Sequence, residues 1–106
     1  MRSLYIVKSD FLKDTGAFVA SDTIHSGVLL SGVEQTVTVP ALAEFVLFNA
    51  DGDFYANYDT TAAIPSGSIT AAGGEKSPAI RSLDEVIDIH LIAEIDTKIT
   101  MAFYSK

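Results

Sequence analysis

Residues 44–58 read EFVLFNADGDFYANY, and this stretch decides how the chain folds. Two short apolar runs, 45–48 and 54–58, flank a polar segment that contains Asp51-Gly52. An Asp-Gly pair between two such runs favours a tight β-hairpin turn. We therefore predict a hairpin here and place it at the centre of the fold.

The first of these runs, Phe45-Val46-Leu47-Phe48, is apolar on both faces and therefore needs a cover on each side. In a sandwich of two sheets, one face of each sheet is buried by the other sheet. Two covers are open for the second face: a neighbouring subunit, or the long loop or N-terminal segment of the same chain.

Strand signals recur along the rest of the chain, whereas no stretch of a dozen residues keeps apolar positions at helical spacing. The cleanest half-buried strand of the first half is 35–39, where polar and apolar residues alternate up to Pro40. Near the C-terminus, 86–93 and 97–104 form a second strong pair, bent at 94–96. The stripes expected to face the core are Ile87, Ile89, Leu91 and Ala93 in the first, and Ile99, Met101 and Phe103 in the second.

Further short strands are expected at 4–7, 17–20 and 27–30, with a turn over residues 13–16. About eight short strands with turn signals at intervals of roughly ten residues predict an all-β fold. The expected architecture is an antiparallel β-sandwich that is jelly-roll-like.

The chain of 106 residues, 48% of them hydrophobic, is expected to form one domain around one core. We expect residues 1–16 to be an N-terminal arm or an edge strand exchanged with a neighbour. Residues 59–82 are rich in Thr, Ala, Ser, Gly and Pro and predict a long loop, which at that length has a function or is held by a neighbour.

Composition excludes several classes of function. The chain has no cysteine, so disulfides and thiolate metal sites are impossible. A net charge of -7 with seven Lys and Arg argues against nucleic acid as a partner. The acidity serves solubility or attracts a basic partner. No segment approaches the roughly 20 apolar residues of a membrane-spanning helix, so a membrane partner is not expected.

The polar turn after residue 48 has some of the features of a calcium-binding loop. Asn49, Asp51 and Asp53 are spaced two apart, but such a loop also needs Gly at its sixth position and Glu at its twelfth. Phe54 and Thr60 stand at those positions. A hairpin turn explains the same residues, and no calcium site is expected.

No other constellation predicts catalysis. The two histidines, His25 and His90, lie far apart, and we expect His90 to project from the face opposite the apolar stripe, beside Asp88. Asp84 and Glu85 are adjacent and so point to opposite faces of a strand, which makes them a poor acid and base pair. No hydroxyl lies in a recognisable nucleophile motif. We expect no enzyme activity, no cofactor and no metal.

Tyrosines expected on the surface are Tyr55, Tyr58 and Tyr104. Such a side chain stacks on a sugar ring, anchors a protein interface, or is an ordinary strand residue half covered by its neighbours. A carbohydrate-binding module would need Tyr55 and Tyr58 around a shallow groove with Asn57 or Asp59. Residues 55 and 58 have opposite parity on a regular strand, so this groove requires a bulge.

Five short blocks follow one another over the second half of the chain: DFY at 53–55, TAAIP at 61–65, SPAI at 77–80, LIA at 91–93 and MAFY at 101–104. This series resembles small structural proteins of tailed-bacteriophage particles, which are all-β modules that decorate or cement a capsid. The resemblance implies a homotrimer that binds the major capsid protein on the outer head surface, and that resides in the host cytoplasm during assembly. A tail, baseplate or head-fibre position is left open.

For such a role, the expected contacts are the two-faced strand, the exposed tyrosines and the apolar anchors of the long loop, which is our candidate for the contact with the shell. These interface residues are Phe45, Val46, Leu47, Phe48, Tyr55, Tyr58, Ile64, Pro65 and Ile69.

Overall fold

The computed structural model describes residues 1–4, 6–8, 14–71 and 73–105, and within these ranges it contains strands and turns but no helix. The all-β prediction is thereby confirmed. The strands are β1 (Ile6–Lys8), β2 (Asp14–Phe18), β3 (Thr23–Leu29), β4 (Gln35–Thr38), β5 (Phe45–Ala50), β6 (Tyr55–Tyr58), β7 (Glu75–Lys76), β8 (Ile80–Ser82), β9 (Asp88–Ile92) and β10 (Thr97–Tyr104).

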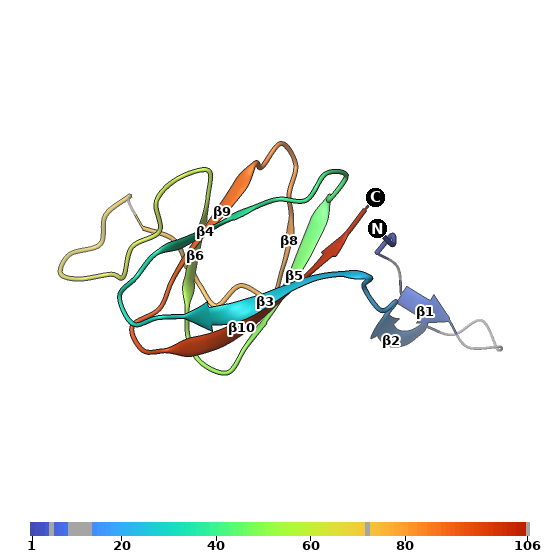
Figure 1. Ribbon diagram of the computed structural model, residues 1–106, viewed down its shortest axis with the longest axis horizontal. Coiled ribbons are helices and arrows are strands. Elements are labelled where there is room, and N and C mark those ends of the chain that lie inside the picture. Colours follow the sequence, from blue (N-terminus) through green and yellow to red (C-terminus); the bar gives the residue numbers. More distant parts are fainter. Residues whose placement is uncertain (5, 9–13, 72, 106) are drawn as a thin grey trace.

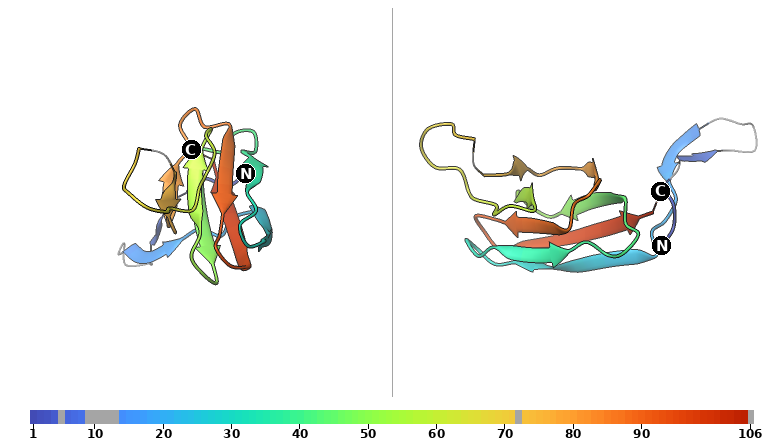
Figure 2. Two further views of the ribbon diagram at one scale, coloured as in Figure 1. Left: turned by 90° about the vertical axis from the view of Figure 1, so that its left-hand side faces the viewer. Right: turned by 90° about the horizontal axis from the view of Figure 1, so that it is seen from above.

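Eight of these strands form two four-stranded antiparallel sheets that pack face to face (Figure 1). One sheet has the order β3-β10-β5-β8 and the other β4-β9-β6-β7. β1 and β2 pair with each other and form a hairpin that projects from one end of the sandwich, while the 59–74 loop projects from the other end (Figure 2). These extensions make the molecule 52 Å long and about half as wide, 26 × 25 Å.

The pairing pattern is that of a jelly roll. Counted inward from the two ends of the sandwich sequence, β3 pairs with β10, β4 with β9, β5 with β8, and β6 with β7. These four pairs describe one long antiparallel ribbon. Rolling that ribbon adds the two contacts that close the sheets, β10 with β5 and β9 with β6. The expected jelly-roll-like sandwich is confirmed.

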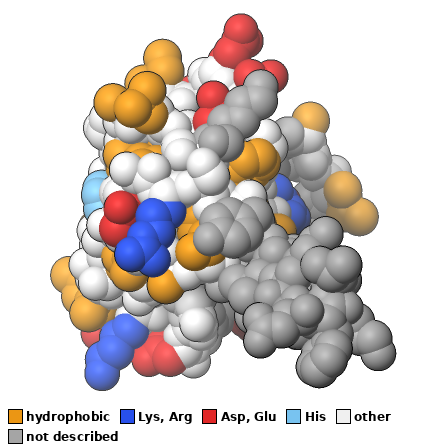
Figure 3. Space-filling view, turned by 90° about the vertical axis from the view of Figure 1, so that its right-hand side faces the viewer, with side chains coloured by type: hydrophobic (Ala, Val, Ile, Leu, Met, Phe, Trp, Pro, Cys, Tyr) orange, Lys and Arg blue, Asp and Glu red, His pale blue; other side chains and the backbone are white. Residues whose placement is uncertain are grey.

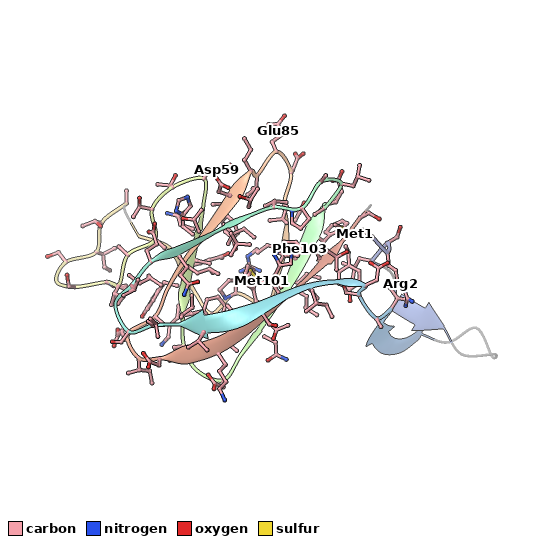
Figure 4. All side chains as sticks on the ribbon, viewed as in Figure 1. Met1, Arg2, Asp59, Glu85, Met101 and Phe103 are labelled. Atoms are coloured by element: carbon pink, nitrogen blue, oxygen red, sulfur yellow. The ribbon has the colours of Figure 1, made fainter. Side chains whose placement is uncertain are left out.

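The core lies between the two sheets and is built from alternate residues of each strand, because successive side chains of a strand point to opposite faces. Met101 and Phe103 lie at its centre (Figure 4). The expected stripes are confirmed with one exception: Ile87 is 67% exposed. It precedes β9, and its backbone N–H is held by the Asp59 carboxylate at 3.0 Å. The buried stripe residues are Ile89, Leu91, Ala93, Ile99, Met101 and Phe103.

The predicted central hairpin is wrong in its pairing, although β5 and β6 are indeed inner strands of their sheets. The two strands belong to opposite sheets, so the turn at Asp51-Gly52 is an arch between layers. Both strands have an apolar inner face, and the Phe48 and Phe54 rings meet with centroids 5.6 Å apart. The Asp51 carboxylate accepts the Lys98 backbone N–H at 2.9 Å, which fixes the arch to β10. The pair expected at 86–93 and 97–104 is divided between the sheets in the same way.

The predicted loop 59–82 is partly wrong, because its second half contains β7 and β8. These strands are two and three residues long and form one edge of each sheet. Strands that short carry no readable alternation of polar and apolar residues, which is why composition alone gave a loop. The true connection from β6 to β7 is residues 59–74.

The N-terminal segment consists of residues 1–4, which lie against the sandwich, and the projecting hairpin of β1 and β2. Residues 1–4 run beside the end of β10, where the Ser105 N–H donates to the Arg2 carbonyl at 2.8 Å. Figure 4 shows Met1 and Arg2 at the base of the projecting hairpin. Two apolar residues of the predicted N-terminal arm, Tyr5 and Phe11, lie outside the described residues.

Candidate interaction surfaces

The two-faced strand β5 contributes to both the core and the outer surface. Val46 is fully buried and Phe48 is 6% exposed, so these two residues of the expected interface belong to the core and cannot contact a partner. Phe45 and Leu47 have the opposite parity and lie half-buried on the outer face of the sheet. The sequence does not show which of these residues point inward, because alternation cannot be read from a continuous apolar stretch.

On that outer face, apolar side chains form a row across all four strands. Leu47 is in register with Ala102 of β10 and Ile80 of β8, and Ala102 is in register with Ile24 of β3. The middle residues are half-buried, while Ile24 at the end of the row is 56% exposed. This row is an apolar strip on the outer face of the sheet, which faces solvent in a single copy of the sandwich.

Tyr104 is wrongly predicted as a surface residue. It is 3% exposed, and its hydroxyl donates to the Val19 carbonyl at 2.7 Å. The Ser21 hydroxyl likewise donates to the Phe103 carbonyl at 2.8 Å. The segment between β2 and β3 is therefore fastened to the end of β10. Seen from this end, hydrophobic side chains outside the grey atoms form separate groups among charged ones (Figure 3).

Tyr58 points inward and closes the sandwich edge formed by β7 and β8. Its hydroxyl lies 2.5 Å from the Glu75 carboxylate, which is also paired with the Arg81 guanidinium at 2.9 Å. Burial, with a further contribution from Glu75, raises the pKa of the Tyr58 hydroxyl above its usual value. Burial alone would raise the pKa of Glu75, but hydrogen bonds from Arg81 and Tyr58 lower it. This polar cluster joins the two sheets. Tyr58 and Arg81 lie 17 and 6 residues from Glu75 in the sequence, which is no recognisable spacing, so sequence reasoning did not find the cluster.

Tyr55 lies on the other face of β6, as its parity predicts, so Tyr55 and Tyr58 cannot share a sugar-binding groove. Tyr55 lines a hollow of about 230 Å³ together with Lys76 and Glu94. Asp53 and Ile95 complete its walls. The hollow combines an aromatic ring with charges of both signs.

The 59–74 loop is anchored at its base and open at its tip. The Asn57 side-chain amide donates to the carbonyls of Thr61, at 3.2 Å, and of Gly73. Residues 63–70, 73 and 74 curl around a hollow of about 450 Å³. Ile69 at the tip is fully exposed. Of the other anchors expected in this loop, Ile64 is half-buried and Pro65 is exposed.

A second anchor connects this loop to the outer face of β9. The Glu34 carboxylate accepts the backbone N–H of buried Ala62 at 2.8 Å. Its other oxygen lies 3.1 Å from Nδ1 of His90. His90 therefore lies on the face predicted for it and is occupied by a structural contact. Sequence reasoning missed Glu34, which is separated from both partners by more than 25 residues.

The residues considered for metal or catalytic chemistry serve turns and packing. The Asp53 carboxylate lies 3.5 Å from the Lys76 ammonium and accepts the Ser77 hydroxyl at 3.3 Å. The His25 ring packs edge-on against Phe103, with centroids 5.1 Å apart. Among the described residues no group of three or more His, Cys, Asp or Glu could hold a metal ion. The described part of the chain also has no helix that could span a membrane.

Comparison with known proteins identifies no relative. No protein-family model matches the chain. Neither a curated protein nor a solved structure shows significant similarity to it.

Proposed function

We propose that this chain is a structural protein of a bacteriophage particle, a capsid decoration or cement protein that binds the outer head surface and stabilises the shell. Two things support the proposal: the series of sequence blocks that resembles phage virion proteins, and a jelly-roll framework that presents a loop and a hairpin at opposite ends. The partners are the major capsid protein and further copies of the chain, arranged as a homotrimer.

The observation that carries the proposal is the anchored, uncharged loop. Residues 60–74 contain no charged side chain in a chain of net charge -7. Asn57 and Glu34 hold the base of this loop against the sheet, so its tip is presented by a fixed scaffold. Loops on rigid scaffolds commonly carry binding function. Ile69, fully exposed, is the side chain that we assign to an apolar pocket on the capsid protein.

The N-terminal hairpin supports association between copies. β1 and β2 pair with each other and with no other described strand. A two-stranded hairpin alone is marginally stable in water, so a surface that covers it would stabilise it. We assign this cover to the neighbouring subunit of the trimer. Many weak contacts around a threefold axis then add through multivalency, and no single contact has to be strong.

The proposal is tested with shells that lack this protein. The purified chain should sediment with them and raise their resistance to heat. Ile69→Asp should abolish sedimentation with the shell, whereas Ile95→Asp, which changes an isoleucine exposed to 68% on a different loop, should not. Absence of binding to shells of its own phage would refute the cement role. Binding to separated tails or baseplates instead of heads would place the module there.

A carbohydrate-binding role is the second candidate, and the hollow beside Tyr55 favours it. Aromatic rings flanked by carboxylates suit sugar rings, which offer an apolar face and a rim of hydroxyls. Titration with sugars should then change the tyrosine fluorescence, and Tyr55→Ala should remove the change. Tyr58→Phe serves as the control because Tyr58 lies on the opposite face of β6.

A further inference from the structure

The four outer strands of the sandwich differ in how well they protect their free backbone edges. β4, β7 and β8 are four, two and three residues long, whereas β3 runs for seven residues. Natural proteins guard exposed edges with short strands, charges, prolines or bulges. β3 contains no Lys, Arg, Asp, Glu or Pro, and its register against β10 continues without a bulge. β3 is therefore the one unguarded edge among the described strands of the sandwich.

The backbone groups of this edge that point away from β10 belong to Ile24, Ser26 and Val28. Lys98 is in register with Val28, but both the N–H and the C=O of Lys98 bond to Asp51 on the other side of β10. Val28 therefore directs its own N–H and C=O away from β10, and alternation assigns the same direction to Ser26 and Ile24. The Val28 carbonyl accepts a hydrogen bond from the exposed side chain of Gln35 at 2.7 Å, on this free side.

The edge is self-complementary about Ser26. When two copies pair antiparallel with Ser26 opposite Ser26, Ile24 of each copy lies opposite Val28 of the other. In the single chain Ile24 is 56% and Val28 44% exposed, so the pairing covers apolar side chains at both ends. The two central hydroxyls can bond to each other. Cross-strand pairs of both kinds stabilise sheets.

Gly27 is an independent indication of a close neighbour. Glycine weakens the interior of a strand and often marks a place where another backbone approaches. The positive-φ glycines are 32, 67 and 73, so the backbone does not require glycine at 27, and nothing lies within 4 Å of the position its Cβ would take. In the pairing centred on Ser26, Gly27 faces His25 of the second copy in a closely spaced pair. The missing side chain leaves room there for the imidazole.

We propose that β3 is a self-pairing edge: two copies join their β3 strands antiparallel about a two-fold axis at Ser26, so that two four-stranded sheets become one continuous sheet. The partner is a second copy of this chain. The Gln35 amide releases the Val28 carbonyl to the neighbouring strand. The interface does not depend on shell attachment. In the threefold assembly proposed above, it would connect copies that belong to adjacent trimers.

Analytical ultracentrifugation over a range of concentrations tests this interface. The mass of the wild-type chain should rise reversibly with concentration, first to twice that of the unit, monomer or trimer, that is present at low concentration. Ser26→Lys places two ammonium groups opposite each other and should raise the dissociation constant tenfold or more. Thr100→Lys is the matched control, because Thr100 lies beside Ser26 on the same face but one strand further in. A wild-type mass that does not change with concentration, or equal effects of the two lysines, would overturn the proposal.

Cross-linking tests the register directly, because the chain has no cysteine of its own. Ser26→Cys should give a covalent dimer with a short bifunctional thiol reagent. Thr100→Cys should not, since in the paired sheet the two copies of residue 100 are three strand spacings, roughly 14 Å, apart. Failure of Ser26→Cys to cross-link, or equal cross-linking at both positions, would exclude the pairing centred on Ser26.

Discussion

Alanine at Gly27 should stabilise the isolated chain, whereas alanine at Gly74 should destabilise it. Neither glycine has a positive φ, so neither is required by its backbone angle. The two sites differ in the space around them. Nothing lies within 4 Å of a Cβ built at Gly27, but a Cβ at Gly74 would be 2.5 Å from the carbonyl oxygen of Ala56 and 2.9 Å from its carbon.

The magnitudes follow from these surroundings. Glycine inside a strand costs roughly 0.5–1 kcal/mol relative to alanine. Because 1 kcal/mol shifts Tm by about 4–8 °C in a domain near this size, Gly27→Ala should raise Tm by about 2–8 °C. At Gly74 the obstructing atoms are backbone and cannot rotate away, so β7 must shift from β6. Overpacking of this kind costs about 1–3 kcal/mol, which lowers Tm by about 4–24 °C.

Thermal unfolding followed by circular dichroism, at a concentration low enough to keep the β3 edges of different copies apart, measures both effects. The same melts repeated at high concentration should show less benefit from Gly27→Ala, because the added methyl group then faces His25 of the second copy. A lower Tm for dilute Gly27→Ala would mean that position 27 is not open within the chain. The inference that its glycine serves a second copy would then fail. A neutral Gly74→Ala would contradict the close approach of β7 to β6.

Three further predictions concern polar groups. Burial and the neighbouring Glu75 raise the pKa of Tyr58 above the ordinary 10.0, so near-ultraviolet titration should show a late tyrosine step that Tyr58→Phe removes. Because the folded pKa is raised, the contribution of Tyr58 to folding stability is present below the ordinary pKa and is lost as the pH rises through the folded value. Hydrogen bonds from Arg81 and Tyr58 outweigh burial and lower the pKa of Glu75. The contribution of Glu75 to folding stability is therefore present above the ordinary pKa of 4.5 and is lost as the pH falls through the lower folded value. Glu75→Gln should flatten this part of the pH dependence of the free energy of unfolding in urea. Asp59→Ala removes the carboxylate that accepts the backbone N–H groups of Ile87 and Asp88, at 3.0 and 2.8 Å, and puts alanine at a φ of 58°. Chemical denaturation should therefore show a free energy of unfolding lower by about 2 kcal/mol, and Asp59→Asn serves as the milder control.

The sequence predicted the parts of the fold that repeat with a period of two. The stripes at 89–93 and 99–103 alternate cleanly and are buried as expected. Which strands pair was not predictable in the same way, because Asp51-Gly52 specifies a turn but not whether the chain stays in one sheet. That choice depends on contacts far along the chain, such as the hydrogen bond that the Lys98 backbone N–H donates to the Asp51 carboxylate. β7 and β8 were missed because strands of two and three residues carry no pattern.

The candidate surfaces were predictable only in part. The continuous apolar run of β5 did not reveal that Val46 and Phe48 point inward while Phe45 and Leu47 point outward. The loop anchors Ile64, Pro65 and Ile69 could be found because a change in composition marks the loop. The strand expected at 27–30 is β3, which begins four residues earlier and occupies Thr23–Leu29, because the polar pair His25-Ser26 interrupts the apolar run. These two polar residues lie at the centre of the self-pairing edge proposed above.

A weak β3 interface is consistent with the proposed role on a shell. Stable protein interfaces bury roughly 1,200–2,000 Å², and a pairing of five residues per copy falls well short of that. Two free copies should therefore associate only at high concentration, so that in the proposed role the chain would not assemble before a shell is present. On the shell, contacts through the 59–74 loop would hold neighbouring copies in place, so that each β3 edge meets its counterpart at a high effective concentration. The same weak contact, repeated across every two-fold position, would then join separate decorations into a continuous net.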